Sequence, residues 1–327
     1  MALNAVRLVA LALSLVLMPP AADAQRSAPH PPVIGRIFGG TAESSRDQIE
    51  AFRQGLRDFG YIEGENIIVE YRFAEGRLER HPDLLREFVQ RPVDVIAVSG
   101  YQGMAAAKQA TNTIPIVGVA CDHPELLVAS LARPDGNVTG VTCMSAGLST
   151  KRVELLKESL PDRVRVAFLH NPEDPGKALE LRDVRTAADA LGLTILPVEV
   201  TAPDGFEAAF ARMVHDRAEA LIVAVDLFTY VHRQRIVDLA AAHRLPGIYG
   251  FRQFTDAGGL MSYGSNLLER VRYTARFIDK LLKGAKPGQL PIDQPTTFEL
   301  VVNLKTARAL GLELPPTLLA RADEVIE

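Results

Sequence analysis

Residues 92–103, PVDVIAVSGYQG, decide the fold of this 327-residue chain. The apolar residues 93–98 follow one another without alternation, which is typical of a strand buried on both faces in a parallel sheet covered by helices. We expect the strand to end just before a helix that starts near Met104. In such sheets, ligands bind beyond the carboxyl ends of the strands. The first candidate ligand contacts are therefore Ser99, Gly100 and Tyr101.

The same alternation of strand and helix occurs twice along the chain, and it predicts parallel α/β sheets with right-handed crossovers. The first copy is expected in strands 33–38, 67–71, 93–98 and 114–119 and helices 47–59, 81–90 and 104–110. The second is expected in strands 164–169, 194–200, 220–225 and 247–249 and helices 178–191, 205–217 and 231–243. The remaining predicted elements connect or follow the two copies: strands 138–142, 260–263 and 298–302 and helices 267–282 and 304–310. About 300 residues in this pattern exceed one ordinary core, so two domains are expected.

The repeat aligns the strand ends of the two copies around one crevice. Ser99 corresponds to Asp226, and Gly39 corresponds to Asn171. An acid at such a strand end can pair with an ammonium group, and the alternative role of Asp226 is to cap the helix that follows. Ser99 and Tyr101 lie at a predicted helix start, where backbone N–H groups can hold a ligand carboxylate. The alternative role of Ser99 is to cap the helix, and that of Tyr101 is to be an aromatic residue of the turn.

Further candidate contacts follow other strands of the two copies. The turn at Gly40 and Thr41 allows close approach of a ligand and offers a hydroxyl donor. For Asn171 the alternative is an ordinary turn residue. Tyr249, Phe251 and Tyr263 are candidates for an aromatic wall of the site, and core packing is the alternative for each ring. The last candidate contact is Asp122.

The N-terminus has the pattern of an export signal in residues 1–24. Arg7 precedes an apolar run of about a dozen residues, too short for the ~20 that span a bilayer. Ala22-Asp23-Ala24 then offers a small-x-small cleavage site before Gln25. Residues 25–32 are rich in proline and polar residues and are expected to be a disordered lead. For residues 1–24, the alternative to a cleaved export signal is an N-terminal membrane anchor.

Composition and motifs narrow the function classes. The chain has 40 acidic and 36 basic residues without a basic cluster, which gives no support for nucleic-acid binding. The sequence lacks the G-x-S-x-G, H-E-x-x-H and P-loop motifs and a dinucleotide fingerprint, so we expect neither an enzyme nor a bound cofactor. Asp122 and His123 would make half a metal site, but no second pair at ligand spacing supports one.

The two cysteines, Cys121 and Cys143, end strands that we expect to be neighbours. A disulfide between the strand ends is geometrically possible in an oxidising compartment. Two buried free thiols are the favoured alternative.

Several stretches resemble a known family. They are AFRQGLRDFGYIEGENIIVEYRFAEG (51–76), ARPDGNVTG (132–140), KRVELLKESLP (151–161), GGLMSYGSN (258–266), KLLKGAKPGQLPIDQPTTFELVVNLKTARALGL (280–312) and PPTLLARADEVIE (315–327). The chain is similar to solute-binding proteins of ABC transporters, specifically the type I periplasmic binding proteins related to tryptophan binders. The resemblance covers almost the whole chain after the signal.

The resemblance implies a two-lobed α/β fold of the type I periplasmic binding proteins, each lobe a parallel sheet flanked by helices. The lobes would be 33–142 plus 265–292 and 143–264 plus 293–327, joined by a hinge of three crossings near Thr142, Ser262 and residues 291–295. A monomeric protein in the periplasm would close on a small polar solute, amino-acid-like or aromatic, and deliver it to an ABC permease. An acid at the position of Asp226 would hold a substrate amine. The alternative is a periplasmic sensor that presents its solute to a membrane signalling partner.

Overall fold

The opening stretch folds into a buried strand and a helix in the computed structural model, which describes residues 30–91, 93–121 and 123–327. The predicted signal peptide, Pro92 and Asp122 lie outside the described residues. Strand β3 (Val95–Ser99) leads into α3 (Tyr101–Ala110), which begins three residues before the predicted Met104. Gly100 has φ +80°, so one residue reverses the chain and the helix starts at once.

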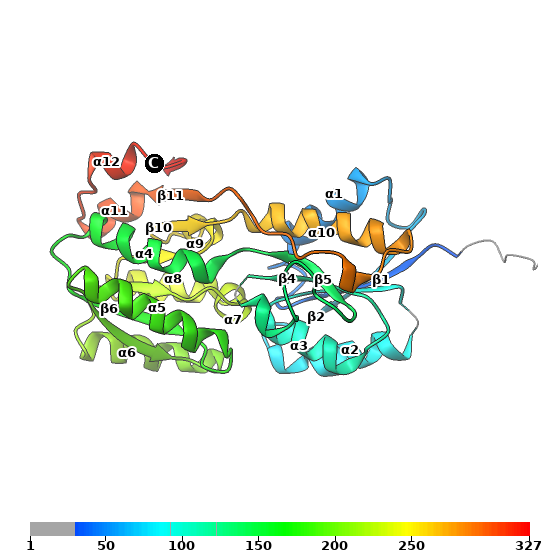
Figure 1. The fold of residues 1–327 in the computed structure, drawn as a ribbon. Coiled ribbons are helices and arrows are strands. Elements are labelled where there is room, and N and C mark those ends of the chain that lie inside the picture. The colour runs from blue at the N-terminus through cyan, green and yellow to red at the C-terminus, as the bar shows by residue number, and fades with distance from the viewer. Residues whose placement is uncertain (1–29, 92, 122) are drawn as a thin grey trace, which may run out of the picture. The chain divides into compact units, whose positions relative to one another are not determined.

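The first sheet is entirely parallel, with the order β2-β1-β3-β4-β5. Its other strands are β1 (Val33–Phe38), β2 (Ile68–Phe73), β4 (Ile116–Ala120) and β5 (Val138–Thr142). Helices α1 (Arg46–Asp58) and α10 (Leu267–Leu282) cover one face, and α2 (His81–Gln90) and α3 cover the other (Figure 1). The buried side chains of Phe52 and Leu56 explain why amphipathic α1 lies on this sheet. We call this sheet with its four helices the first lobe.

The second sheet has seven strands in the order β12-β11-β10-β9-β8-β6-β7. They are β6 (Arg165–His170), β7 (Thr194–Glu199), β8 (Ala220–Val223), β9 (Gly247–Tyr249), β10 (Met261–Gly264), β11 (Glu299–Asn303) and β12 (Glu324–Ile326). The predicted parallel arrangement is confirmed for most of this sheet, and β11 alone runs antiparallel to its neighbour β10 among the described pairs. Between β10 and β11 the chain passes through α10, which packs on the first lobe and not across the second sheet as the crossover helix of a parallel pair would.

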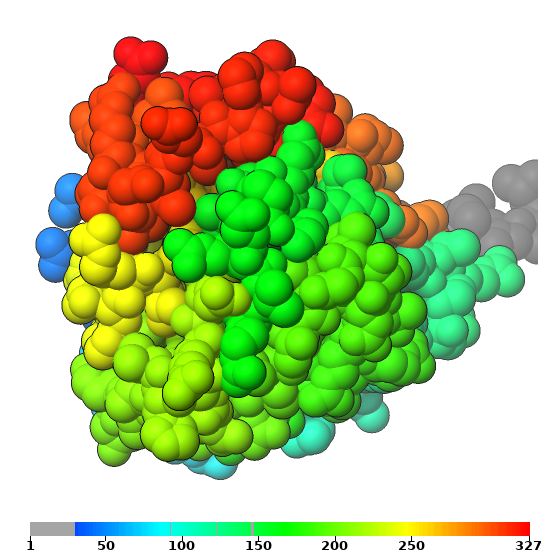
Figure 2. All heavy atoms as spheres, turned by 90° about the vertical axis from the view of Figure 1, so that its left-hand side faces the viewer, coloured from blue at the N-terminus to red at the C-terminus, as the bar shows by residue number. Residues whose placement is uncertain are grey.

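Helices cover both faces of the second sheet, and together they form the second lobe. α4 (Ser145–Ser159) and α5 (Gly176–Ala190) pack on one face, and α6 (Phe206–His215), α8 (Arg233–Ala242) and α9 (Arg252–Asp256) pack on the other. After α11 (Leu304–Leu310), the short α12 (Pro316–Leu319) lies against α4, where the red end of the chain meets green in Figure 2. Short 3₁₀ turns are η1 (Leu78–Arg80), η2 (Pro124–Leu126), η3 (Pro203–Gly205) and η4 (Pro287–Gln289).

One predicted helix is divided in two. Residues 231–243 were expected to be continuous, but α7 (Leu227–Val231) precedes α8 and begins directly after Asp226. The Asp226 carboxylate accepts the backbone N–H of Thr229 at 2.6 Å, and the Thr229 hydroxyl accepts the Asp226 N–H at 3.4 Å. This capping box fixes the helix start four residues earlier than the apolar pattern indicates.

Three chain segments connect the two sheets and hydrogen-bond to one another. Thr142 N donates to Asp293 O at 2.8 Å, and Asp293 N donates to Gly140 O at 3.0 Å. The Ser265 hydroxyl donates to Cys143 O at 3.3 Å. The crossing expected at Ser262 lies just after β10, since Ser262 itself is paired within the sheet. The exact lobe bounds stay a prediction.

Cys121 and Cys143 form a disulfide, with Cα atoms 4.2 Å apart. They directly follow β4 and β5, whose register pairs Ala120 with Thr142. The predicted adjacency of the strand ends is confirmed, and the favoured alternative of free thiols is wrong. Within the described part of the chain, no helix combines the length and apolarity needed to cross a bilayer.

Candidate functional site

A small cavity lies where the strand ends of the two lobes meet. Its volume is about 30 Å³, enough for a water molecule or two. First-lobe residues are Gln48, Ser99, Gly100, Val119, Cys121 and Leu267, and second-lobe residues are Val225, Asp226, Leu227, Tyr230 and Phe251. We call it the central cavity. Of the predicted contacts, it brings together Ser99, Gly100, Asp226 and Phe251.

Asp226 is the buried carboxylate of the central cavity. Its Oδ1 accepts the Thr229 N–H, while its Oδ2 has no hydrogen-bond partner among the described residues. Burial raises the pKa of Asp226 to about 6, although Lys177 and the Thr229 N–H act in the opposite direction. The cap and the ligand contact are therefore compatible, because each uses a different oxygen of the same side chain.

A network of buried charges supports the strand ends behind Asp226. The Lys177 ammonium donates to Val225 O at 2.5 Å and to Glu180 Oε2 at 2.9 Å, and the Ser149 hydroxyl donates to Glu180 Oε1 at 2.5 Å. Arg152 donates from Nη1 to Ser149 and from Nε to a β10 carbonyl oxygen. Burial alone would raise the pKa of Glu180, but Lys177 and Ser149 outweigh it and hold that pKa below its ordinary value. Sequence reasoning missed this network, although charged residues three positions apart on an inward helix face were a signal.

The side chain of Leu227 reaches from the second lobe to the first at the central cavity. A Cβ on Gly39 would lie 2.9 Å from the Leu227 side chain, and a Cβ on Gly100 would lie 2.8 Å from it. The two glycines form a notch in the first lobe that fits this side chain from the second. Nearby, His232 Nε2 lies 3.3 Å from Gly76 O. The two lobes are therefore in direct contact in this structure.

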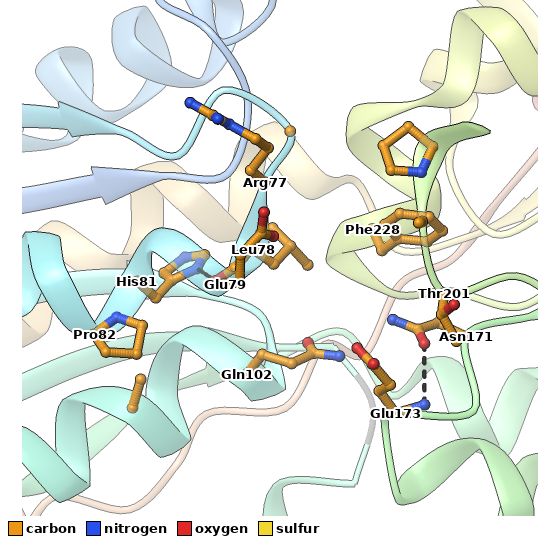
Figure 3. A pocket seen from close by; sticks show the side chains of 14 residues that line it. Arg77, Leu78, Glu79, His81, Pro82, Gln102, Asn171, Glu173, Thr201 and Phe228 are labelled. Atoms are coloured by element: carbon orange, nitrogen blue, oxygen red, sulfur yellow. Dashed lines mark hydrogen bonds between the residues drawn. The ribbon is translucent and has the colours of Figure 1, made fainter. Parts of the chain in front are cut away.

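A wider groove of about 480 Å³ lies beside the central cavity (Figure 3). Arg77, Glu79, His81 and Gln102 of the first lobe and Asn171, Glu173, Thr201 and Phe228 of the second line this groove, and the Gln102 side chain extends toward Glu173. Asn171, a predicted contact, is buried and accepts the Glu173 N–H at 3.0 Å. Both amide atoms of Gln102 are buried and lack hydrogen-bond partners among the described residues. Gln102 is thus the groove's clearest unused hydrogen-bonding group.

The other predicted contacts line neither the central cavity nor the groove. Thr41 is exposed, and its hydroxyl accepts the Ser44 N–H in the turn before α1. The three aromatic residues do not form one wall, because each ring packs on a different neighbour. Tyr249 stacks on Phe254, Tyr263 lies beside Phe298, and Phe251 meets Tyr230 edge-on. The remaining predictions outside these cavities are Gly40 and Tyr101, and Asp122 lies outside the described residues.

Seven of the eleven residues that line the central cavity were not predicted as contacts, among them Leu227, Tyr230 and Gln48. Leu227 and Tyr230 follow Asp226 on α7, and Gln48 comes from α1. Gln48 and Tyr230 come from different lobes and line the same cavity. The sequence offered no signal for Gln48, since it lies within a helix and not at a strand end.

The family model of ABC transporter substrate binding proteins matches residues 41–326. The chain belongs to this family. Its members are binding proteins and not enzymes. A tyrosine-binding protein of Clostridioides difficile (strain R20291) is 24% identical over 268 residues, which are 81% of this chain and 76% of that protein.

Solved structures share the fold. A conserved domain protein from Vibrio cholerae is 23% identical with a TM-score of 0.84, covering 90% of this chain and all of that one. An ABC domain from Streptococcus pneumonia in complex with L-Trp is 23% identical with a TM-score of 0.81 and the same coverage. With the two helix-flanked sheets, these likenesses show the two-lobed type I periplasmic binding fold.

Proposed function

We propose that this protein is the solute-binding component of an ABC importer and holds a small solute between its lobes at the central cavity. The observation that carries this proposal is Asp226, a buried carboxylate with one oxygen unpaired, in a cavity shared by both lobes. A buried charged group without a partner is costly, so a ligand ammonium or amide that pairs with it gains affinity.

The names of two similar proteins support an amino-acid-like solute. One is called tyrosine-binding, and the other was solved with L-Trp. Such a solute is larger than the present cavity of about 30 Å³. Leu227 therefore has to leave its notch before the solute enters, which requires the lobes to separate and close again. The parts that move would be 33–142 plus 265–292 against 143–264 plus 293–327.

Calorimetry on unfolded and refolded, ligand-stripped protein with each of the twenty L-amino acids tests the site. We expect at least one to bind, and Asp226→Asn to weaken that binding by about 10- to 100-fold, as for a lost charged hydrogen bond. Asp279→Asn is the matched control, because Asp279 is also buried but lies on α10 beside Lys283. Unchanged affinity in Asp226→Asn would contradict the proposed site.

Transport and location need separate measurements. We propose export to the periplasm, with a monomeric mature protein that starts at Gln25 and delivers its solute to a membrane permease. Mass spectrometry of the periplasmic fraction checks the start, and light scattering checks the monomer. Deletion of the gene should abolish uptake of the solute identified by calorimetry. Normal uptake in the deletion strain would contradict the importer and favour a sensor.

A further inference from the structure

Arg36 is a buried cation inside the first lobe. It lies on β1, an inner strand of the parallel sheet, and is 1% exposed. Its guanidinium lies 4.4 Å from the centre of the Phe38 ring and 5.4 Å from that of Phe52. Burial lowers the pKa of Arg36 to about 10, so the group remains charged at neutral pH.

No carboxylate balances this charge within the described part of the chain. Arg36 forms no ion pair there, and its Nε has no hydrogen-bond partner. Among the described residues, its side chain forms one hydrogen bond, from Nη2 to Ser99 Oγ at 3.1 Å. Aromatic faces compensate part of the cost of burying a cation, but an unpaired buried charge normally costs several kcal/mol. A residue that serves packing alone would be expected to be apolar.

Ser99 connects this cation to the central cavity. Because Ser99 Oγ accepts from Arg36, its own O–H is left to donate elsewhere, and the half-buried Ser99 lines the cavity. The neighbouring Gly100 N–H is already used, since it donates to Val119 O at 3.0 Å. The hydroxyl also lies at the start of α3, where the helix dipole favours negative charge. The local field therefore favours an acceptor that carries negative charge.

We propose that Arg36 is a positioning residue of the solute site and, acting through Ser99, selects solutes that carry an anionic group on the first-lobe side. The inference rests on the proposed function, because it assumes that the central cavity is the solute site. With Asp226 on the opposite wall, the preferred solute carries a carboxylate at one end and a hydrogen-bond donor at the other.

Acetate is the minimal probe, and acetamide is its neutral counterpart of nearly the same shape. Melting temperatures of ligand-stripped protein are measured in about 100 mM of each, with chloride holding the ionic strength constant. We expect acetate to raise the melting temperature of the wild type by about 2 °C above acetamide, as for a ligand about tenfold above its Kd. Arg36→Met and Ser99→Ala should lose this difference, and Arg36→Lys should keep part of it.

Arg86→Met is the matched control, because Arg86 is exposed and pairs with the neighbouring Asp83. A purely structural role for Arg36 would lower all melting temperatures of Arg36→Met but leave the acetate difference intact. That result, or no acetate difference in the wild type, would overturn the inference. Ser99→Ala keeps the inference testable if Arg36→Met does not fold.

The two proposals fail in different ways. Asp226→Asn should keep or enlarge the acetate difference, since it removes a negative charge from the wall opposite Ser99. If the wild type shows the acetate difference but Asp226→Asn binds the solute as tightly as the wild type, the proposed function is contradicted and the proposed role of Arg36 in anion binding stands. If solute binding depends on Asp226 but the wild type shows no acetate difference, the proposed function stands and the role of Arg36 is overturned.

Discussion

Replacing Gly39 by alanine should shift the protein toward an open arrangement of the lobes. The new methyl would lie 2.9 Å from three carbon atoms of Leu227, well inside the ~3.5–4 Å of ordinary carbon contacts. Overpacking of this kind costs about 1–3 kcal/mol. Because Gly39 and Leu227 belong to different lobes, the cost falls on the closed arrangement and not on folding. The ratio of closed to open protein should therefore fall by roughly 5- to 150-fold.

Small-angle scattering of the solute-free protein measures this shift as a larger radius of gyration. The double variant Gly39→Ala with Leu227→Ala should be less open than Gly39→Ala alone, since it returns the missing space. Gly147→Ala is the control, because a Cβ there meets no atom within 4 Å. The reasoning is refuted if Gly39→Ala leaves the radius unchanged, or if the double variant is as open as the single one.

Three further predictions concern stability, each measured by denaturant or thermal unfolding. Removing the Cys121–Cys143 disulfide by Cys143→Ser should lower the free energy of unfolding by about 3 kcal/mol, from its sequence separation of 22, and no loss would refute this. Because the pKa of Asp226 is raised to about 6, its folded form binds the proton more tightly, and the free energy of unfolding should fall as pH rises from about 4 to 6. This fall in the free energy of unfolding should reach up to about 3 kcal/mol in the wild type and be absent in Asp226→Asn. If the free energy of unfolding changes with pH in the same way in both proteins, the prediction is contradicted. Gly55→Ala should destabilise by about 1–3 kcal/mol, since its Cβ would lie 2.2 Å from a backbone oxygen of α10. Gly147→Ala, at an exposed position of α4, should instead stabilise by up to about 1 kcal/mol, and equal effects of the two substitutions would be contrary evidence.

Apolar runs and helix periodicity were enough to place most of the fold. β1, β5, β9, α2, α10 and α11 have the predicted bounds, because apolar runs end at polar, glycine or proline residues. The break between α7 and α8 depends on side-chain hydrogen bonds of Asp226 within an otherwise helical pattern, so periodicity did not reveal it. The antiparallel direction of β11 depends on the path by which the chain returns, which no local pattern encodes.

The candidate site was predictable where it follows from topology alone. Strand ends located Ser99 and Asp226 at one crevice, and they placed Cys121 beside Cys143. Leu227 was missed because its position matters only together with the glycines of the other lobe. The aromatic residues were predicted less well, because whether a large ring lines a cavity depends on the direction of its side chain, which its position along a strand does not determine.

The order of segments along the chain ties the completion of the two lobes together. α10 packs on α1 in the first lobe, and β11 and β12 extend the sheet of the second. A ribosome or an export channel that still holds residues 267–327 therefore keeps both lobes unfinished at once. Neither lobe can serve as a separately expressed fragment cut at residue 142, and a circular permutant that joins the last segment to its partners earlier would change the order of folding.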